Sequence, residues 1–315
     1  MAEVRPKVAA LSMIAAMAVI GLIDNLFVAL SGKIGLWQFH AARSALAIAL
    51  LVVVSLFLGR RLRPRSVGAV AIRSGLIAAS MVIYFGSLGF LPIAQVAAGL
   101  FTAPIFVLVI SWAFLGRGIG PRRVLAVAVG FTGIIVTLRP AGGDLGLLSL
   151  APVLAGLLYG LGNLATRELC ADESVLILVC GGLVGLGLIG AAVSLTLTLL
   201  LPGLAVEDAF LLRPWTWPDA VTWAWICVQV VGVLVGVGLL TRAYAMGEAS
   251  SVAVFEYTFL VFAAVWAFVL RGEIPTLVSL AGMALIAGSG AILALRPQTG
   301  PPAASPGPHL PGGRA

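Results

Sequence analysis

The chain has little charge. Asp, Glu, Lys and Arg make up 10% of its 315 residues, whereas apolar residues make up 61% and the mean hydropathy is +1.14. Soluble domains carry about 25% charged residues, and a soluble fold of this size could not bury so much apolar surface. The scarcity of charge therefore excludes a water-soluble globule. It predicts an integral membrane protein whose surroundings are the lipid bilayer.

Histidine and cysteine are also scarce. The chain has two histidines and three cysteines, and the spacing of the cysteines is not that of a metal site. No HExxH, GxSxG or Walker A sequence is present. These absences argue against a histidine-based metal site, an intramembrane hydrolase and an ATP-driven pump. We expect a protein that is not an enzyme, with no catalytic residue, no metal and no cofactor.

The long apolar runs predict ten membrane-spanning helices, since about 20 residues are needed to cross the hydrocarbon core. The predicted spans are residues 8–30, 36–58, 67–89, 92–115, 121–138, 147–167, 174–201, 220–244, 251–270 and 275–295. The first is longer than the apolar core of a signal peptide, so we interpret it as a retained span. The Pro- and Gly-rich tail, 298–315, is predicted to be disordered and cytoplasmic.

The net charge of +7 comes from short basic clusters between the apolar runs. Such clusters are typical of cytoplasmic loops rather than of a nucleic-acid interface. With the N-terminus inside, most Lys and Arg residues, Arg73 among them, fall on the inner side. We therefore expect no nucleic-acid partner, and a multi-pass protein of the inner (plasma) membrane with both termini in the cytoplasm.

Two motifs recur in the same order along the chain. WAFLGR at 112–117 returns as WAFVLR at 266–271, and GFTGIIVTLRP at 130–140 returns loosely as AGSGAILALRP at 287–297. Pro121 and Pro275 share the first offset of 154. Five helices per unit is an odd number, so two tandem copies must insert in opposite orientations. The sequence predicts two inverted five-helix repeats, 1–140 and 141–297, with chance similarity of apolar segments as the alternative.

The chain resembles the drug/metabolite transporter superfamily of the EamA type. The resemblance rests on AAGLFTAPIFVLVISWAFLG and GFTGIIVTL in the first half, and on RAYAMGEASSVAVFEYTFLVFAAVWAFVLRGE and SLAGMALIAGSGAILAL in the second. Arg43 also sits where such proteins often carry a second-helix arginine. One departure is that the first half ends its fourth helix in LGRG, where the family commonly has an acid that Glu273 keeps in the second half.

This resemblance implies a ten-helix permease that moves a small metabolite by alternating access, driven by protons or by exchange. The family includes exporters of amino acids and drugs and importers of vitamins. In it the substrate path is lined by the first, third, fourth, sixth, eighth and ninth helices. The alternative is a membrane scaffold or sensor subunit that transports nothing.

We single out Asp24, Arg43 and Glu256 as charged residues inside the predicted spans, where a charge facing lipid costs several kcal/mol. Asp24 and Arg43 both lie roughly 10 Å below the outer surface, so they can pair, either as a structural staple or as part of a site. Glu256 lies roughly 8 Å above the inner surface, near the depth of Arg242. It is either the partner of Arg242 or a carboxyl in a central cavity that binds an amine or carries a proton.

Polar and aromatic residues elsewhere in the spans complete a candidate site, although each can equally be a packing residue. The candidates for substrate binding or coupling are Asp24, Glu256, Tyr84, Gln95, Asn163 and Tyr257, with Arg43 and Arg242 in structural ion pairs. Pro104 should kink the fourth helix. Glycines spaced by four, such as Gly156 and Gly160, allow close helix packing within the bundle or a homodimer.

Overall fold

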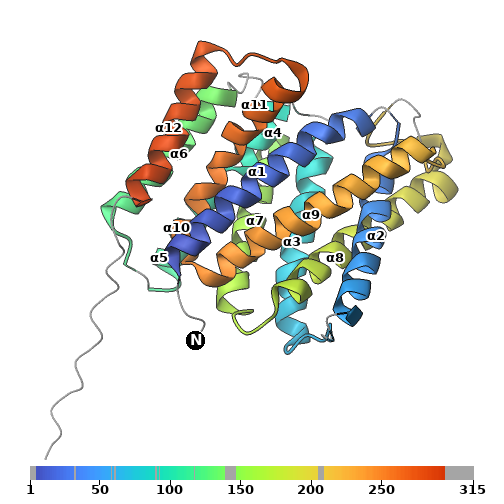
Figure 1. The fold of residues 1–315 in the computed structure, drawn as a ribbon, viewed down its shortest axis with the longest axis horizontal. Coiled ribbons are helices and arrows are strands. Elements are labelled where there is room, and N and C mark those ends of the chain that lie inside the picture. The colour runs from blue at the N-terminus through green and yellow to red at the C-terminus, as the bar shows by residue number, and fades with distance from the viewer. Residues whose placement is uncertain are drawn as a thin grey trace, which may run out of the picture.

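The computed structural model describes residues 5–31, 33–57, 59, 62–88, 91, 93–116, 118–138, 147–204 and 209–294, and every regular element in these ranges is a helix (Figure 1). The α-helices are α1 (Pro6–Ser31), α2 (Leu36–Phe57), α3 (Val67–Ser87), α4 (Ile93–Leu100), α5 (Ala103–Ala113), α6 (Pro121–Leu138), α7 (Ala151–Glu168), α8 (Val175–Leu195), α9 (Ala220–Met246), α10 (Ala249–Val252), α11 (Thr258–Arg271) and α12 (Leu277–Ala294). The 3-10 segments are η1 (Leu147–Leu150), η3 (Pro202–Leu204) and η4 (Ala253–Tyr257), and a π-helical turn, η2 (Thr196–Leu200), extends α8. The predicted tail, 298–315, lies outside the described residues.

Eight helical segments of the described chain are long and apolar enough to cross a membrane. They are Pro6–Phe27, Leu36–Phe57, Val67–Ser87, Val96–Ala113, Pro121–Leu138, Val175–Leu200, Ala220–Met246 and Ala249–Arg271. A shorter apolar helix, Leu277–Leu293, accompanies them. The 18-residue helix α7 fills the predicted 147–167 segment and is not among the eight. The all-helical, multi-pass architecture is therefore confirmed, while the count of ten spans stays a prediction.

The outer surface of the bundle carries large apolar side chains. Phe57, Phe114 and Trp112 are 88%, 81% and 64% exposed. Exposed apolar area on this scale is unfavourable in water and matches the hydrocarbon of a bilayer. The exposed residues thus mark the lipid-facing surface, and polar side chains that point inward are the ones available for function.

Local side-chain contacts explain where several helices begin and end. Ser66, Ser174 and Asp219 precede α3, α8 and α9, and each side chain accepts a hydrogen bond from the backbone N–H three residues later. Such caps satisfy an otherwise unpaired donor at the helix start. Gly272 ends α11 with φ of +70°, a left-handed conformation that glycine adopts without strain.

Helices distant in sequence pack side by side. α1 lies against α9 and α11, α2 against α8, α3 against α7, and α6 against α12, as Figure 1 shows for the last pair. In Figure 1 the N-terminus, α5 and α10 lie at the same end of the bundle. We call the end where α1 begins the N-terminal face, and the end where α1 stops the opposite face.

The closest helix contacts are made at glycines. A Cβ on Gly133 of α6 would lie 2.7 Å from the carbonyl oxygen of Gly282 of α12, which is too close for any side chain. Gly156 belongs to one of the predicted pairs of glycines spaced by four residues. A Cβ on Gly156 would lie 2.6 Å from the carbonyl oxygen of Gly99. These glycines therefore serve packing within the bundle. The homodimer stays a prediction.

Candidate functional site

Glu256 lies in a break of a membrane-spanning helix. Regular helix α10 ends at Val252, residues Ala253–Tyr257 form the 3-10 turn η4, and α11 resumes at Thr258. A 3-10 stretch inside a longer helix often marks a hinge, because its hydrogen bonds are tighter and poorer than those of an α-helix. The Glu256 side chain is only 4% exposed.

The Glu256 carboxylate accepts two hydrogen bonds on the same oxygen. The Tyr244 hydroxyl of α9 and the Asn163 Nδ2 of α7, at 3.4 Å, both donate to Oε1. Tyr159 and Tyr257 interact electrostatically with the same carboxylate. The chain has four tyrosines, so three of them gather around this one acid.

Two polar atoms beside Glu256 have no hydrogen-bond partner. The Asn163 Oδ1 and the Tyr257 hydroxyl are both buried and both unpaired. Buried polar atoms are normally satisfied, and the exceptions mark places where a ligand, a water or a conformational change supplies the partner. The cluster can therefore accept a hydrogen-bonding group or a proton beyond those it already holds.

The predicted pair of Glu256 with Arg242 is wrong. Arg242 is exposed, and its Nε donates to the Met246 sulfur at 3.3 Å. Arg242 and Tyr244 are two residues apart on α9, which turns them about 200° from each other around the helix. Because Tyr244 points inward to Glu256, Arg242 points outward.

Arg73, which we counted among the basic residues of the inner side, belongs to the buried interior. It lies in α3 and is 2% exposed. Its guanidinium donates to Thr166 Oγ1 at 3.0 Å, to the Leu178 carbonyl at 2.8 Å and to Thr241 Oγ1 at 3.4 Å, on α7, α8 and α9. It also interacts electrostatically with Tyr159, so it adjoins the Glu256 cluster. Its place inside the apolar run 67–89 was the signal that would have found it.

Asp24 and Arg43 form a second polar group, away from Glu256. They interact electrostatically, but no salt bridge joins them in the described chain, so the predicted ion pair is not in contact. Arg43 Nη2 instead contacts His40 Nδ1 at 3.2 Å, and the guanidinium lies 4.9 Å from the centre of the Phe39 ring. Tyr84 of α3 is half-buried and interacts electrostatically with Asp24.

Asp24 is exposed although it points into the bundle. Met13 and Met17 lie on the same face of α1 as Asp24 at helical spacing, and both are buried. Leu11, on the other side of α1, is 67% exposed to the lipid-facing surface. The inward face of α1 is therefore packed near the N-terminal face and accessible near the opposite face.

The predicted site residues thus divide into two clusters. Glu256, Asn163 and Tyr257 form the buried cluster, and Asp24, Tyr84 and Arg43 form the accessible one. The side chain of Gln95 lies outside the described residues. Tyr244 was missed, although the rarity of tyrosine in the chain was a usable signal.

No group of three His, Cys, Asp or Glu side chains in the described ranges could hold a metal ion. The buried cluster offers one carboxylate, an amide and phenol groups, a set that suits hydrogen bonding and proton exchange better than metal binding.

Comparison with known proteins identifies the family. Residues 7–139 match the model of the EamA-like transporter family. This segment therefore carries an EamA-like domain, and the relatives described below support an EamA-type permease of the drug/metabolite transporter superfamily. A solved structure, titled only as the crystal structure of a protein, superposes with a TM-score of 0.73 at 18% identity, over 91% of this chain and 95% of the other, which supports the fold alone.

Three relatives carry transporter names. A "Riboflavin transporter" of Rhizobium johnstonii is 37% identical over 98 residues, which are 31% of this chain and 32% of that protein. A "Riboflavin transporter" of Brucella anthropi is 27% identical over 82% of this chain and 86% of its own length. A "Pseudopaline exporter CntI" of Pseudomonas aeruginosa is 26% identical over 78% and 81%. Family and names indicate a transporter rather than an enzyme.

Proposed function

We propose that the chain is a secondary transporter that moves a small organic solute across the inner membrane by alternating access. The observation that carries this proposal is the buried Glu256 cluster, which sits on a 3-10 hinge inside a spanning helix. Broken spans at membrane depth are tolerated where the backbone lines a site or is buried in protein, and they mark binding sites in secondary transporters.

A second broken span supports the inverted repeat. The segment Val96–Ala113 is interrupted at Phe101 and Thr102, directly before Pro104, and the Thr102 hydroxyl donates to the Gly99 carbonyl at 2.6 Å. The sequence offset of 154 carries Thr102 onto Glu256. Both proposed repeats thus interrupt their fourth helix at equivalent positions, as expected of paired discontinuous helices around one central site.

The helix packing follows the same symmetry. If α1 corresponds to α7 and α3 to α9, the contact of α1 with α9 becomes the contact of α7 with α3, and both are extensive. The contact of α6 with α12 maps onto itself, because these helices end the two repeats. This pairing supports ten spans, two units at 1–140 and 141–297, and a pseudo-two-fold axis between them.

The exposure of the interior supports a resting state closed on one side. With both termini in the cytoplasm, as the basic loops favour, the packed residues Met13 and Met17 lie on the cytoplasmic side and Asp24 on the outer side. We propose that Asp24, Tyr84 and Arg43 line the outer approach. Glu256, with Asn163 and the tyrosines, then binds the solute or carries the coupled proton at the central position.

The names of the relatives set the range of solutes to test. They include a riboflavin transporter and a pseudopaline exporter, so neither substrate nor direction transfers directly to this chain. A carboxylate with unpaired acceptor and hydroxyl groups beside it favours a solute rich in hydrogen-bond donors. Riboflavin and amines are therefore the first probes.

A counterflow assay tests the proposal without knowledge of the driving ion. Purified protein is reconstituted in liposomes preloaded with unlabelled riboflavin, an amino acid or an amine, and entry of the labelled probe is followed. We expect transient accumulation of at least one probe, and a rise of the Tm of the protein with that probe's concentration, because a ligand that binds only the folded state must stabilise it. Glu256→Gln should abolish the accumulation.

The matched control is Glu273→Gln, which removes an exposed acid paired with the neighbouring Arg271 and should leave counterflow unchanged. Normal counterflow in Glu256→Gln would remove Glu256 from the transport site. A double variant, Asp24→Asn with Glu256→Gln, separates the alternative function: a scaffold or sensor subunit would tolerate the loss of both acids.

A further inference from the structure

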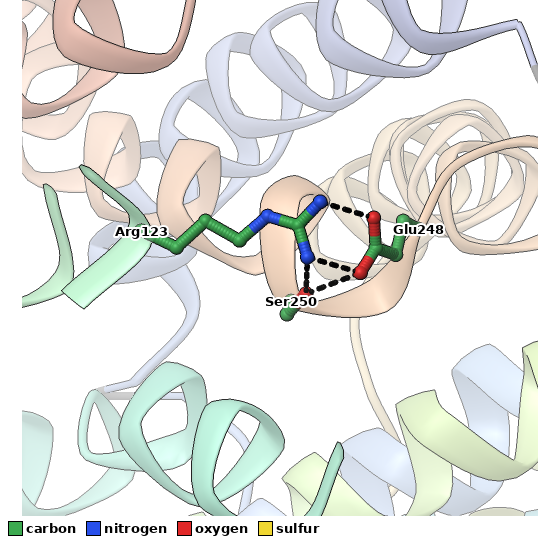
Figure 2. A network of polar contacts seen from close by, with 3 residues as sticks. All are labelled: Arg123, Glu248 and Ser250. Carbon is green, nitrogen blue, oxygen red and sulfur yellow. Dashed lines mark hydrogen bonds and ion pairs between the residues drawn. The ribbon is translucent and has the colours of Figure 1, made fainter. Parts of the chain in front are cut away.

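An ion pair joins the two halves of the chain at the N-terminal face. Arg123, in the first turn of α6, contacts both carboxylate oxygens of Glu248 through its two terminal nitrogens, as Figure 2 shows. The Ser250 hydroxyl completes the network, at 3.3 Å from Arg123 and 3.1 Å from Glu248. The side chains of Arg123 and Glu248 are 17% and 23% exposed. Bidentate guanidinium–carboxylate contacts are among the stronger polar interactions in proteins.

This pair holds the segment that leads into the hinge. Glu248 is the N-cap residue of α10, and α10 runs directly into η4, which carries Glu256. The backbone N–H of Arg5 donates to the Met246 carbonyl at 3.1 Å, which places the segment at the N-terminal face. Movement of α10 about the 3-10 turn would separate Glu248 from Arg123, because α6 belongs to the other half.

The equivalent positions at the opposite face carry no charge. The repeat offset of 154 carries Arg123 onto Leu277 and Glu248 onto Ala94. Leu277 is 84% exposed, whereas Arg123 is largely covered. An ion pair is therefore built at only one of two positions that the repeat makes equivalent.

We propose that Arg123, Glu248 and Ser250 form a latch that keeps the N-terminal face closed and breaks each time that face opens. The inference rests on the proposed alternating access and adds the residues that set its resting state. No solute contact is assigned to these three residues. Their charge pair biases the empty carrier toward the state in which Asp24 is accessible.

A labelling experiment tests the latch without any solute. Ser111 of α5 is 1% exposed, its hydroxyl makes no hydrogen bond, and α5 packs against α10, so Ser111→Cys is a nearly isosteric reporter behind the latch. In the Ser111→Cys protein, Glu248→Gln should raise the rate of modification by a hydrophilic maleimide roughly fivefold or more, since loss of one or two kcal/mol changes a population ratio by that factor. The exchanged pair, Arg123→Glu with Glu248→Arg, should return the rate toward its original value.

The matched control is the ion pair of the opposite face. Lys33 and Asp219 lie 3.6 Å apart and are 49% and 60% exposed, and Asp219→Asn keeps the N-cap of α9. This variant should leave the labelling of the Ser111→Cys reporter unchanged. Equal labelling of the reporter with and without Glu248→Gln, or a fast rate that the exchanged pair does not reverse, would overturn the latch. Continued protection of the buried Cys170 from the maleimide, together with an unchanged Tm, excludes general unfolding as the cause.

The latch and the proposed function fail in different ways. If Glu248→Gln opens the reporter site while no probe shows counterflow, the latch stands and the transport proposal fails. If counterflow is found and the reporter stays protected in every latch variant, the transport proposal stands and the latch fails.

Discussion

The two acids inside the membrane-spanning helices have opposite surroundings. Glu256 is buried and accepts hydrogen bonds from Tyr244 and Asn163, whereas Asp24 is exposed and interacts electrostatically with Arg43 and Tyr84. A buried carboxylate must be hydrogen-bonded or neutral, since desolvation of a free charge is expensive. An exposed one meets no such requirement.

The contrast means that depth in the membrane does not by itself determine whether a charged side chain is buried or exposed. Asp24 and Met17 lie on one face of α1, about two turns apart, yet only Met17 is packed. The interior is filled around Glu256 and accessible around Asp24, as expected of a carrier at rest with one side closed. The two acids should therefore respond differently to the same substitutions.

The largest difference should appear when each acid is truncated to alanine. Glu256→Ala leaves the Tyr244 hydroxyl and the Asn163 amide without their acceptor, so we expect a loss of about 2–4 kcal/mol in the free energy of unfolding. Asp24→Ala should cost under about 1 kcal/mol, because its side chain is exposed. Denaturant titration of both variants in the same detergent measures the two values. Equal losses would mean that the two acids share one environment.

A smaller effect is expected from Tyr244→Phe, which removes one hydroxyl and leaves Glu256 with its longer contact to Asn163. The loss should be about 1–3 kcal/mol, the range for a buried charged acceptor that loses a donor. The double variant with Glu256→Gln should fall well short of the sum, because the two residues act on one bond. Tyr84→Phe, in the accessible cluster, is the control and should show no such coupling to Glu256. Additive losses for Tyr244 and Glu256 would contradict the hydrogen bond.

The sequence was sufficient to find both acids, because a charge in an apolar run is conspicuous. It also identified Asn163 and Tyr257, which the structure places beside Glu256. The prediction that Arg242 pairs with Glu256 failed, because it compared the depths of the two residues in the membrane and not the directions of their side chains around the helix axis. Depth gives the position of a residue along the membrane normal, whereas the direction of its side chain depends on its position around the helix axis.

Two sets of contacts could not be read from the sequence. The place of Arg73 in an apolar run is visible in the sequence, but its three acceptors come from helices far away along the chain. The pair of Arg123 and Glu248 links residues 125 positions apart. Both depend on how the two halves pack, which local patterns do not encode.

The difference in exposure along α1 can be measured with cysteine variants that change stability little. Asp24→Cys and Met17→Cys place thiols on one face of α1, and we expect a hydrophilic maleimide to modify the first much faster than the second. The physical reason is the difference in exposure between the two positions. Mass spectrometry of the labelled protein measures both rates, and Leu11→Cys reports on the lipid-facing side. Comparable rates at 17 and 24 would mean that the interior of α1 is uniformly packed.

The smallest effect is expected from Arg242→Gln. Arg242 is exposed and contacts the Met246 sulfur, so its loss should change the free energy of unfolding by no more than about 0.5 kcal/mol. Counterflow of any transported probe should also stay unchanged. If Glu256 depended on this cation, Arg242→Gln would instead match the loss seen in Tyr244→Phe. A measured equality of the two would restore the ion pair that the rotation of α9 excludes, and it would require Glu256 to turn toward the surface.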